Sequence, residues 1–420
     1  MKRFIHYILI TLVALLPLAA QAEGHAEAPA AGAEKKALQA DSTKTVQADS
    51  MQISLLTCSA GQQVYELYGH FAIRLHDLTP GHESDWVFNY GMFSFRRPHF
   101  MWHFMLGETD YSLGVYPYAL FCEEYMREGR GIEEQQLDLT PAEKKKLVDA
   151  LSDNVRPENA TYRYNFFYDN CTTRAIRMVE QAVDGTIVWP KADEKKTLRD
   201  IVHEFSAVSP WNKFGQDLLL GSEADRPADI QKQMFAPIYA KEFAEKALIR
   251  TADGRTRHLV KSTRTILPEA LPASAMKPFP ITPMWAFGML LALTLLIEAL
   301  EIRRKKYYWG FDALLLAAQG LTGCIIAFLF CFSAHPAVGS NWLVALFNPL
   351  PLLLLPWFMK DASNRCLNWG MGVQTVMLAI TMLAAALALQ DFPAEVYLIV
   401  AVLLIRVLTH VRIVKAAKRG

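Results

Sequence analysis

Long uncharged apolar runs follow one another through the last third of the chain, and they constrain its fold more than any other feature. Each is long enough to cross a hydrocarbon core of about 30 Å as a helix. The runs are Pro278–Ile297, Ala313–Ala334, Pro336–Met359, Cys366–Gln390 and Val396–Val414, the last interrupted by Arg406. We therefore expect a transmembrane domain over 278–420 with five helices, at about 278–297, 313–334, 339–359, 368–390 and 396–414.

The basic residues between these runs predict their orientation. The segments Ser333–Asn341 and Gln390–Glu395 carry no Lys or Arg. The alternate connections and the tail carry ten, namely Arg303, Arg304, Lys305, Lys306, Lys360, Arg365, Arg412, Lys415, Lys418 and Arg419. Because basic loops stay in the cytoplasm, we expect a cytoplasmic C-terminus and, across five spans, an N-terminal domain on the outer side.

The N-terminus predicts export independently. Lys2 and Arg3 precede an apolar run, Phe4–Leu18, which ends in the small-residue site Ala20-Gln21-Ala22. This pattern is typical of a secretory signal peptide, here 1–22. The following residues, 23–50, have almost no large apolar side chain and predict a disordered linker. The expected location is the cell inner membrane, with residues 51–265 in the periplasm.

Overall charge and cysteine content exclude several classes of protein. The 43 Lys and Arg balance 42 Asp and Glu, which argues against binding nucleic acid. Six cysteines in 420 residues are too few for a disulfide-dense scaffold. The spacing of His and Cys has no zinc signature, so we expect neither a metal nor another cofactor.

Residues 51–265 predict one α+β domain. Val64–His76 and Asp85–Tyr90 alternate as two strands, with His76 opposite Asp85. Thr140-Pro141-Ala142-Glu143 is a capping box that begins a helix, and Thr161–Tyr168 is typical of a strand. Further predictions are a helix over Thr172–Val183, mostly helical structure over 197–248 and a hairpin at Ala252-Asp253-Gly254.

Cys171 is the best candidate nucleophile. It lies at the predicted start of a helix, where free backbone N–H groups and the helix dipole lower a thiol pKa and receive an oxyanion. The alternative is a small buried packing residue. Cys58 and Cys122 could pair with each other in an oxidising compartment, although the sequence does not establish this disulfide.

His70 is the candidate base. Alternation places His70, Ala72 and Arg74 on one face of the strand. In the expected hairpin Asn89 lies diagonally across on the same face, where its carboxamide could orient the imidazole. Tyr90, His76 and Asp77 are alternatives for this orienting role.

Four segments together carry a resemblance to a known family. They are Leu55–Gly61, Tyr68–Arg74, Phe88–Gly91 and Phe166–Arg174. The chain resembles the Lnb family of bacterial lipoprotein N-acyltransferases, and the likeness continues through Leu219–Arg226, Met234–Pro237, His335-Pro336 and Asn348-Pro349. The order His first and Cys later also resembles the circularly permuted, papain-like NlpC fold of lecithin:retinol acyltransferase.

The resemblance implies Cys171 as nucleophile and His70 as base in acyl transfer from phospholipid. Permuted acyltransferases often have a second His where Asn89 lies, so the third residue stays open. Met92–Leu106, with Arg96 and Arg97, could be an interfacial element or a segment of the core. Further candidates for lipid binding are Arg74, His335, Asn341 and Asn348, the last three near outer ends of spans, where helix capping is the alternative.

The sequence thus predicts a membrane-bound N-acyltransferase. Its substrates would be a membrane phospholipid, as acyl donor through a Cys171 thioester, and the N-terminal amine of diacylglyceryl-cysteine lipoproteins, as acceptor. The alternatives are an NlpC-like cell-wall cysteine peptidase or amidase and a non-enzymatic envelope receptor or assembly protein. The sequence does not predict an oligomeric state.

Overall fold

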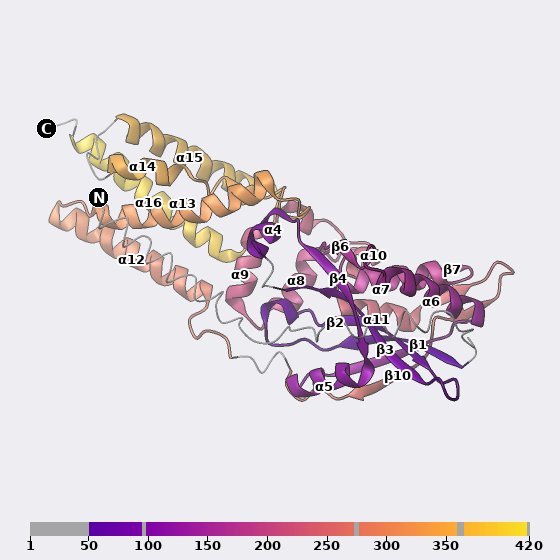
Figure 1. Ribbon diagram of the computed structural model, residues 1–420. Helices are drawn as coiled ribbons and strands as arrows, with labels where there is room; N and C mark the ends of the chain where they lie inside the picture. Colours follow the sequence, from indigo (N-terminus) through magenta and orange to yellow (C-terminus); the bar gives the residue numbers. More distant parts are fainter. Residues whose placement is uncertain (1–49, 95–97, 273–276, 359–364, 418–420) are drawn as a thin grey trace.

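The computed structural model describes residues 50–94, 98–272, 277–358 and 365–417. The predicted signal peptide, the linker up to residue 49, Arg96, Arg97 and Lys360 lie outside these residues. The chain forms an α+β domain that is joined end to end with a bundle of long helices (Figure 1). The predicted fold class, an α+β domain followed by apolar helices, is therefore confirmed.

A seven-stranded antiparallel sheet forms the centre of the α+β domain, in the order β10-β5-β1-β2-β3-β4-β6. The strands are β1 Met51–Cys58, β2 His70–Asp77, β3 Ser84–Met92, β4 Asp110–Pro117, β5 Ile132–Leu137, β6 Thr161–Arg163 and β10 Val260–Leu267. His76 pairs with Asp85 between β2 and β3, so the predicted register is confirmed.

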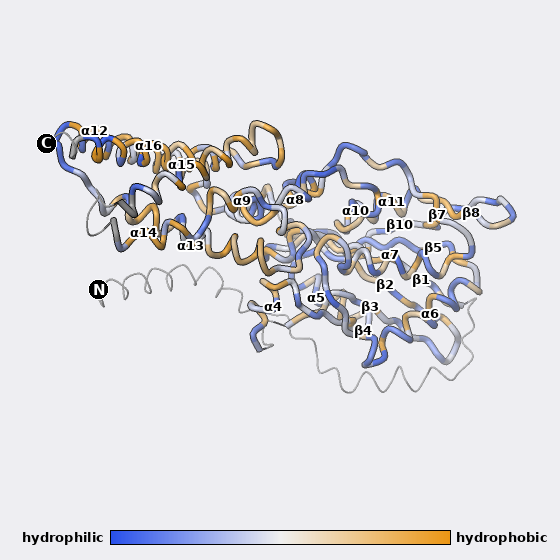
Figure 2. Tube along the Cα trace, turned by 90° about the horizontal axis from the view of Figure 1, so that it is seen from above, coloured by the Kyte–Doolittle hydropathy of each residue, from blue (hydrophilic) through white to orange (hydrophobic). Residues whose placement is uncertain are grey.

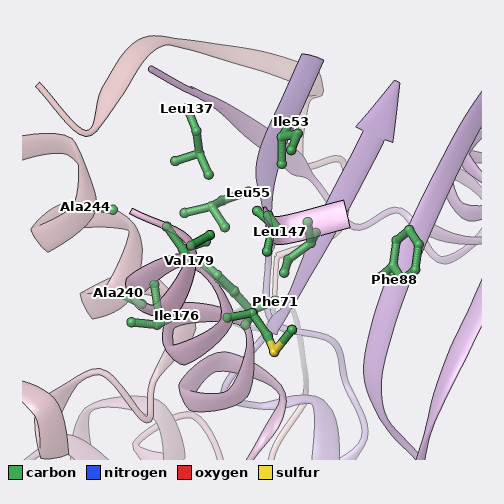
Figure 3. Packing of buried hydrophobic residues seen from close by; sticks show 14 of the residues in the cluster. Ile53, Leu55, Phe71, Phe88, Leu137, Leu147, Ile176, Val179, Ala240 and Ala244 are labelled. Carbon is green, nitrogen blue, oxygen red and sulfur yellow. The ribbon is translucent and has the colours of Figure 1, made fainter. Parts of the chain in front are cut away.

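Helices cover both faces of this sheet. The helices α6 Pro141–Val155, α7 Cys171–Ala182 and α11 Pro237–Lys246 lie on one face, and α5 Tyr118–Glu128 lies on the other. Figure 3 shows Phe71 and Leu55 of the sheet beside Ile176 and Val179 of α7. Alternation along β2 sends Phe71 toward α7 and Ala72 toward α5, as predicted.

Local sequence signals account for several element boundaries. Thr140 caps α6, where its side chain accepts from the Glu143 N–H and the Glu143 side chain accepts from the Thr140 N–H. The predicted hairpin joins β8 Leu248–Arg250 to β9 Thr256–His258, and β7 Thr186–Val188 completes this second sheet.

Two predicted strands are too long. Residues 64–69 contain the 3-10 turn η1 Val64–Glu66 instead of a strand, because Gly69 with φ +79° turns the chain into β2. Only Thr161–Arg163 of the predicted strand Thr161–Tyr168 pairs with the sheet. The following residues form a loop that the Asn165 side chain closes by accepting the N–H groups of Phe167 and Tyr168.

The region predicted as helical, 197–248, is a series of short helices around a buried arginine. It contains α8 Leu198–Ser206, α9 Pro210–Leu219, η2 Ser222–Asp225, α10 Ile230–Gln233 and α11. Arg199 is almost fully buried and donates to Asp217 at 2.8 Å, to Asp225 at 2.5 Å and to the Leu220 carbonyl at 2.9 Å. Paired in this way, the buried charge ties three of these elements together.

Four helices within the described residues are long and apolar enough to cross a membrane. They are α12 Pro283–Arg304, α13 Trp309–Phe332, α15 Arg365–Ala386 and α16 Ala394–Ala417. Figure 2 shows hydrophobic residues along these helices. The first predicted span, 278–297, begins too early, because Thr282 caps α12 and Pro283 occupies its first turn.

The predicted helix at 339–359 is wrong over its first half. Residues 335–349 form a loop with the 3-10 turn η4 Trp342–Val344, and the helix α14 begins only at Leu350 and is described to Phe358. The loop returns into the bundle, since a Cβ on Gly323 of α13 would lie 2.4 Å from the Asn348 backbone. The Gln319 side chain donates to the Leu346 carbonyl at 2.6 Å there, so the non-helical backbone finds partners inside the bundle.

Contacts within the bundle explain how the charged Arg406 is accommodated in an apolar helix. It does not reach out of the bundle but lies buried on α16, in ion pairs with Glu301 of α12 and Asp312 of α13. Two carboxylates on neighbouring helices compensate a charge that would otherwise be costly at this position. The C-terminal end of α16 lies at the end of the bundle remote from the α+β domain (Figure 1).

Candidate active site

Cys171 is the first residue of α7, and the preceding residue fixes this helix start. The Asn170 side chain accepts from the N–H groups of Thr172 at 3.0 Å and Thr173 at 2.9 Å. Its Nδ2 donates to the Phe235 carbonyl at 2.8 Å. A fully engaged N-cap therefore holds the thiol at the positive end of the helix dipole.

His70 lies against this thiol. It is the first residue of β2, and its ring is in hydrogen-bond contact with Cys171, as is the N–H of Phe71. The His70 Nε2–H donates to the Asn89 Oδ1, which leaves Nδ1 to face the thiol. Cysteine, histidine and asparagine thus form a continuous chain of contacts, the arrangement in which a base is oriented by a third group.

Tyr116 extends this chain and was missed by the sequence analysis. The Asn89 Nδ2 donates to the Tyr116 hydroxyl, and the Met92 sulfur lies 3.3 Å from the same nitrogen. Tyr116 is on β4 and pairs with Val87. Because β4 was not among the predicted strands, no sequence signal brought Tyr116 to this site.

The pKa values distinguish Cys171 from the other cysteines of the domain. Burial raises the pKa of the Cys171 thiol, but the charge and hydrogen bond of His70 outweigh burial and bring it below its ordinary value. Burial lowers the pKa of His70, but the adjacent thiolate raises it above its ordinary value. Burial alone dominates at Cys58 and raises its pKa to about 12. A thiolate–imidazolium pair is thus favoured at Cys171.

Cys58 and Cys122 are both free thiols, so the disulfide considered from the sequence is not formed. Cys58 lies in β1 opposite His70 of β2 and is buried, while Cys122 lies in α5. The two residues belong to different elements on the α5 face. Burial raises the pKa of Cys122 as well, which leaves Cys171 as the activated thiol.

Gly91 gives Cys171 room. The pairing of β3 with β4 shifts between Asn89 and Met92, a β-bulge at the end of β3. Gly91 has φ +91°, and a Cβ on it would lie 3.5 Å from the Cys171 Cβ. A left-handed backbone conformation and close approach therefore favour glycine here.

Tyr162 is a second residue that the sequence analysis missed. Its buried hydroxyl has no hydrogen-bond partner among the described residues, and it would lie 4.0 Å from a Cβ on Gly91. The Arg174 guanidinium lies 3.6 Å from the centre of the Tyr162 ring. Buried hydroxyls normally have partners, so an unpaired one beside an activated thiol is free to bind a reacting oxygen.

The alternatives for the orienting role lie elsewhere. The Asp77 carboxylate accepts from the N–H and hydroxyl of Thr79, in the turn after β2. His76 lies opposite Asp85, six residues along β2 from His70. Tyr90 packs on the α7 face of the sheet, whereas Asn89 contacts His70 directly.

Four of the predicted lipid-binding residues lie within the described residues, and each has a partner in the protein. Arg74 is buried between Asp85 and Glu134. Asn341 donates to the Leu218 carbonyl at 2.7 Å, while Asn348 accepts from the Leu350 N–H at 3.1 Å and caps α14. His335 donates from Nε2 to the Phe104 carbonyl at 3.0 Å. These contacts favour capping and domain joining as the roles of His335, Asn341 and Asn348.

Within the described residues, no group of three or more His, Cys, Asp or Glu side chains is placed to hold a metal ion. The structure defines a protein in which an α+β domain with a Cys–His–Asn site adjoins a bundle of helices long and apolar enough to cross a membrane. Residues 38–204 match the Lnb N-terminal periplasmic domain, and residues 274–418 match the Lnb transmembrane domain. The chain therefore belongs to the Lnb family. No curated protein and no solved structure matches it significantly.

Proposed function

We propose that this protein is a lipoprotein N-acyltransferase of the inner membrane, with its site in the periplasm. One observation supports this function best. An activated cysteine contacts an oriented histidine at the start of β2, the end of the sheet where β4 follows the helix α4 Phe100–Leu106 and α4 is bonded to the end of α13. Such a pair carries out acyl transfer through a thioester, and its position suits an acyl donor that resides in the bilayer.

In the first half-reaction the Cys171 thiolate attacks the ester carbonyl of a phospholipid. The S–C bond forms, and the oxyanion is bound by the N–H of Cys171 and the Tyr162 hydroxyl. The ester C–O bond then breaks, and His70 gives its proton to the leaving lysophospholipid oxygen. The product is an acyl thioester on Cys171.

In the second half-reaction the amine of a diacylglyceryl-cysteine lipoprotein attacks this thioester. His70, now neutral, accepts the proton from the amine as the C–N bond forms. Breakage of the C–S bond restores the thiolate, and the imidazolium is again its partner. Asn89, held by Tyr116, keeps the His70 ring in one orientation through both steps.

A cell-wall cysteine peptidase of similar fold would use the same residues. What disfavours it is the membrane domain, which a soluble wall substrate does not require, together with the membership in the Lnb family. A receptor or assembly role without catalysis leaves the lowered pKa of Cys171 without a purpose.

The test is a thioester trap combined with product analysis. Purified protein is incubated with phospholipid, and the Cys171 peptide is measured by mass spectrometry before and after neutral hydroxylamine. We expect an acyl mass on Cys171 that hydroxylamine removes, and triacylated lipoprotein in cells that express the wild type but not Cys171→Ala. An acyl mass on Cys58 or Cys122, or unchanged lipoprotein mass, would contradict the proposal.

A further inference from the structure

The short helix α4 Phe100–Leu106 connects the site to the membrane domain. A hydrogen bond of 2.8 Å joins the Ala334 N–H, just after α13, to the Leu106 carbonyl. Gly107 follows α4 and packs closely on the chain after α13, since a Cβ on Gly107 would lie 2.9 Å from the backbone nitrogen of His335. Figures 1 and 2 both place α4 beside the end of α13. The helix is thus fixed at the outer end of a membrane span.

Three of the four exposed side chains of α4 are apolar, and His103 is the fourth. Met101, Trp102 and Phe104 are 58%, 52% and 42% exposed. The Trp102 ring contacts Phe328 of α13 at 5.0 Å between centroids. Phe332, at the last turn of α13, is 66% exposed, so the apolar surface of α4 continues onto a helix whose exposed side faces lipid.

Other exposed aromatic residues mark the same level of the molecule. Trp285 in the first turn of α12 is 70% exposed, and the Trp211 indole of α9 donates to the Ile281 carbonyl at 2.7 Å just before that helix. Tryptophan collects where a bilayer meets water. The outer ends of α12 and α13 therefore define an interface at which α4 also lies.

From the start of α4 a row of stacked rings leads toward Cys171, beginning at Phe100, whose ring also stacks on Phe104. Phe100 is buried and stacks on Phe93, with 5.7 Å between centroids, and Phe93 stacks on Tyr111 at 5.0 Å. Tyr111 in turn stacks on Tyr164 at 4.0 Å. Tyr164 and Cys171 pack against the same hydrophobic core, so this row of rings ends near the thiol.

We propose that α4 inserts Met101, Trp102 and Phe104 into the outer leaflet and is the place where the acyl chain of a phospholipid leaves the bilayer for the site. The proposal rests on the acyltransferase function and adds the entry point of its donor. Continuity with the exposed surface of α13 identifies the occupant as lipid. The row of stacked rings links α4 to the surroundings of Cys171, so a chain that leaves the bilayer at α4 is close to the site.

The first experiment locates the lipid without any substitution. The full-length protein is placed in vesicles of phosphatidylethanolamine and phosphatidylglycerol that contain a photoactivatable phospholipid, and cross-linked peptides are identified. We expect cross-links within 100–106, beside those on α13. An α4 peptide free of label, with α13 labelled, overturns the insertion of α4 whether or not the protein is an acyltransferase.

The second experiment compares two acyl donors in Trp102→Ser. We expect the ratio of acylation rates, bilayer phospholipid over water-soluble p-nitrophenyl butyrate, to fall roughly tenfold, because one large apolar anchor is lost. Trp102→Phe should restore most of this ratio, and Trp285→Ser, which removes an even more exposed ring away from the stacked row, should keep it. An unchanged ratio in Trp102→Ser overturns the entry role. If wild type is acylated by neither donor, the acyltransferase function itself fails.

Discussion

The Cys171 thiol and the His70 ring change each other's protonation. His70 lowers the thiol pKa against the effect of burial, and the thiolate raises the pKa of His70. Each charged form thus stabilises the other, which favours a Cys171 thiolate beside a cationic His70. Alkylation of Cys171 by iodoacetamide should therefore rise with pH through a value below that of an ordinary thiol.

In His70→Gln the pKa of the Cys171 thiol should be raised above its ordinary value instead of lowered. Burial then acts without an opposing cation, so the rise in alkylation of Cys171 moves above the range of ordinary thiols. Peptide mass spectrometry separates Cys171 from the exposed Cys324 and Cys331. Acyl-enzyme formation should fall about 10²-fold or more with the loss of acid–base help. A variant with the wild-type pH profile would remove His70 from the mechanism.

Tyr162→Phe should separate activity from stability. Removing the hydroxyl takes away a proposed oxyanion donor, for which rate losses of about 10²–10³-fold are typical. The same change removes a buried hydroxyl that has no partner, so the melting temperature should stay or rise. Tyr90→Phe is the matched control, since its hydroxyl is also buried and unpaired. Equal losses of activity in both variants would argue for packing instead of oxyanion binding.

Among single residues, the sequence predicts those members of the site that stand in a recognisable local pattern, such as a helix start or an alternating strand. Asn170-Cys171 looks like a helix start, and the alternation around His70 places Asn89 on the same face. Tyr116 and Tyr162 belong to β4 and β6, which reach the site only through the order of strands in the folded sheet. A single sequence contains no signal for that order.

Among the elements, the loop before α14 shows where hydropathy ceases to predict structure. Residues 336–359 are as apolar as a membrane helix, yet Asn341 binds carbonyls of α9, and Asn348 with Pro349 delays the helix to Leu350. An apolar composition indicates that a segment is buried away from water. It does not state whether neighbouring helices satisfy its backbone, which is what permits a loop at this depth.

The glycines of α13 make this loop possible, and their substitution tests it. A Cβ on Gly323 would lie 2.4 Å from the Asn348 carbonyl carbon, so Gly323→Ala must push the loop away. We expect a loss of about 1–3 kcal/mol in unfolding free energy, the usual cost of overpacking. Gly288→Ala on α12 meets nothing within 4 Å and should be neutral or slightly stabilising. Thermal unfolding in detergent measures both, and equal stability would show that the loop does not pack on α13.

For the whole molecule, the α+β domain and the bundle are held by contacts that a flexible tether would not need. The Gly221 N–H donates to the Ala337 carbonyl at 2.6 Å, and Gln390 donates to the Leu220 carbonyl at 3.0 Å. Both contacts join the domain to loops between membrane helices. Such contacts fix the domain that carries Cys171 relative to the bundle, as the proposed lipid substrate requires.

The last prediction concerns the path of the chain through the membrane. We expect five crossings, with the loop and helix α14 forming one of them, although only four helices within the described residues are long enough to span a membrane. A reporter that is active only in the periplasm should give a signal when fused after Ser340 and none when fused after Gly420. The charges agree, since Arg303 and Arg304 end α12 while residues 333–341 carry no Lys or Arg.

The two ways in which this could fail have different meanings. A periplasmic signal after both Ser340 and Gly420 would mean an even number of crossings, with α14 turning back inside the bundle, and Cys171 would still face the lipoproteins. A silent Ser340 fusion would reverse the orientation. Cys171 would then lie in the cytoplasm, away from its proposed acceptors, and the acyltransferase function would fail with it.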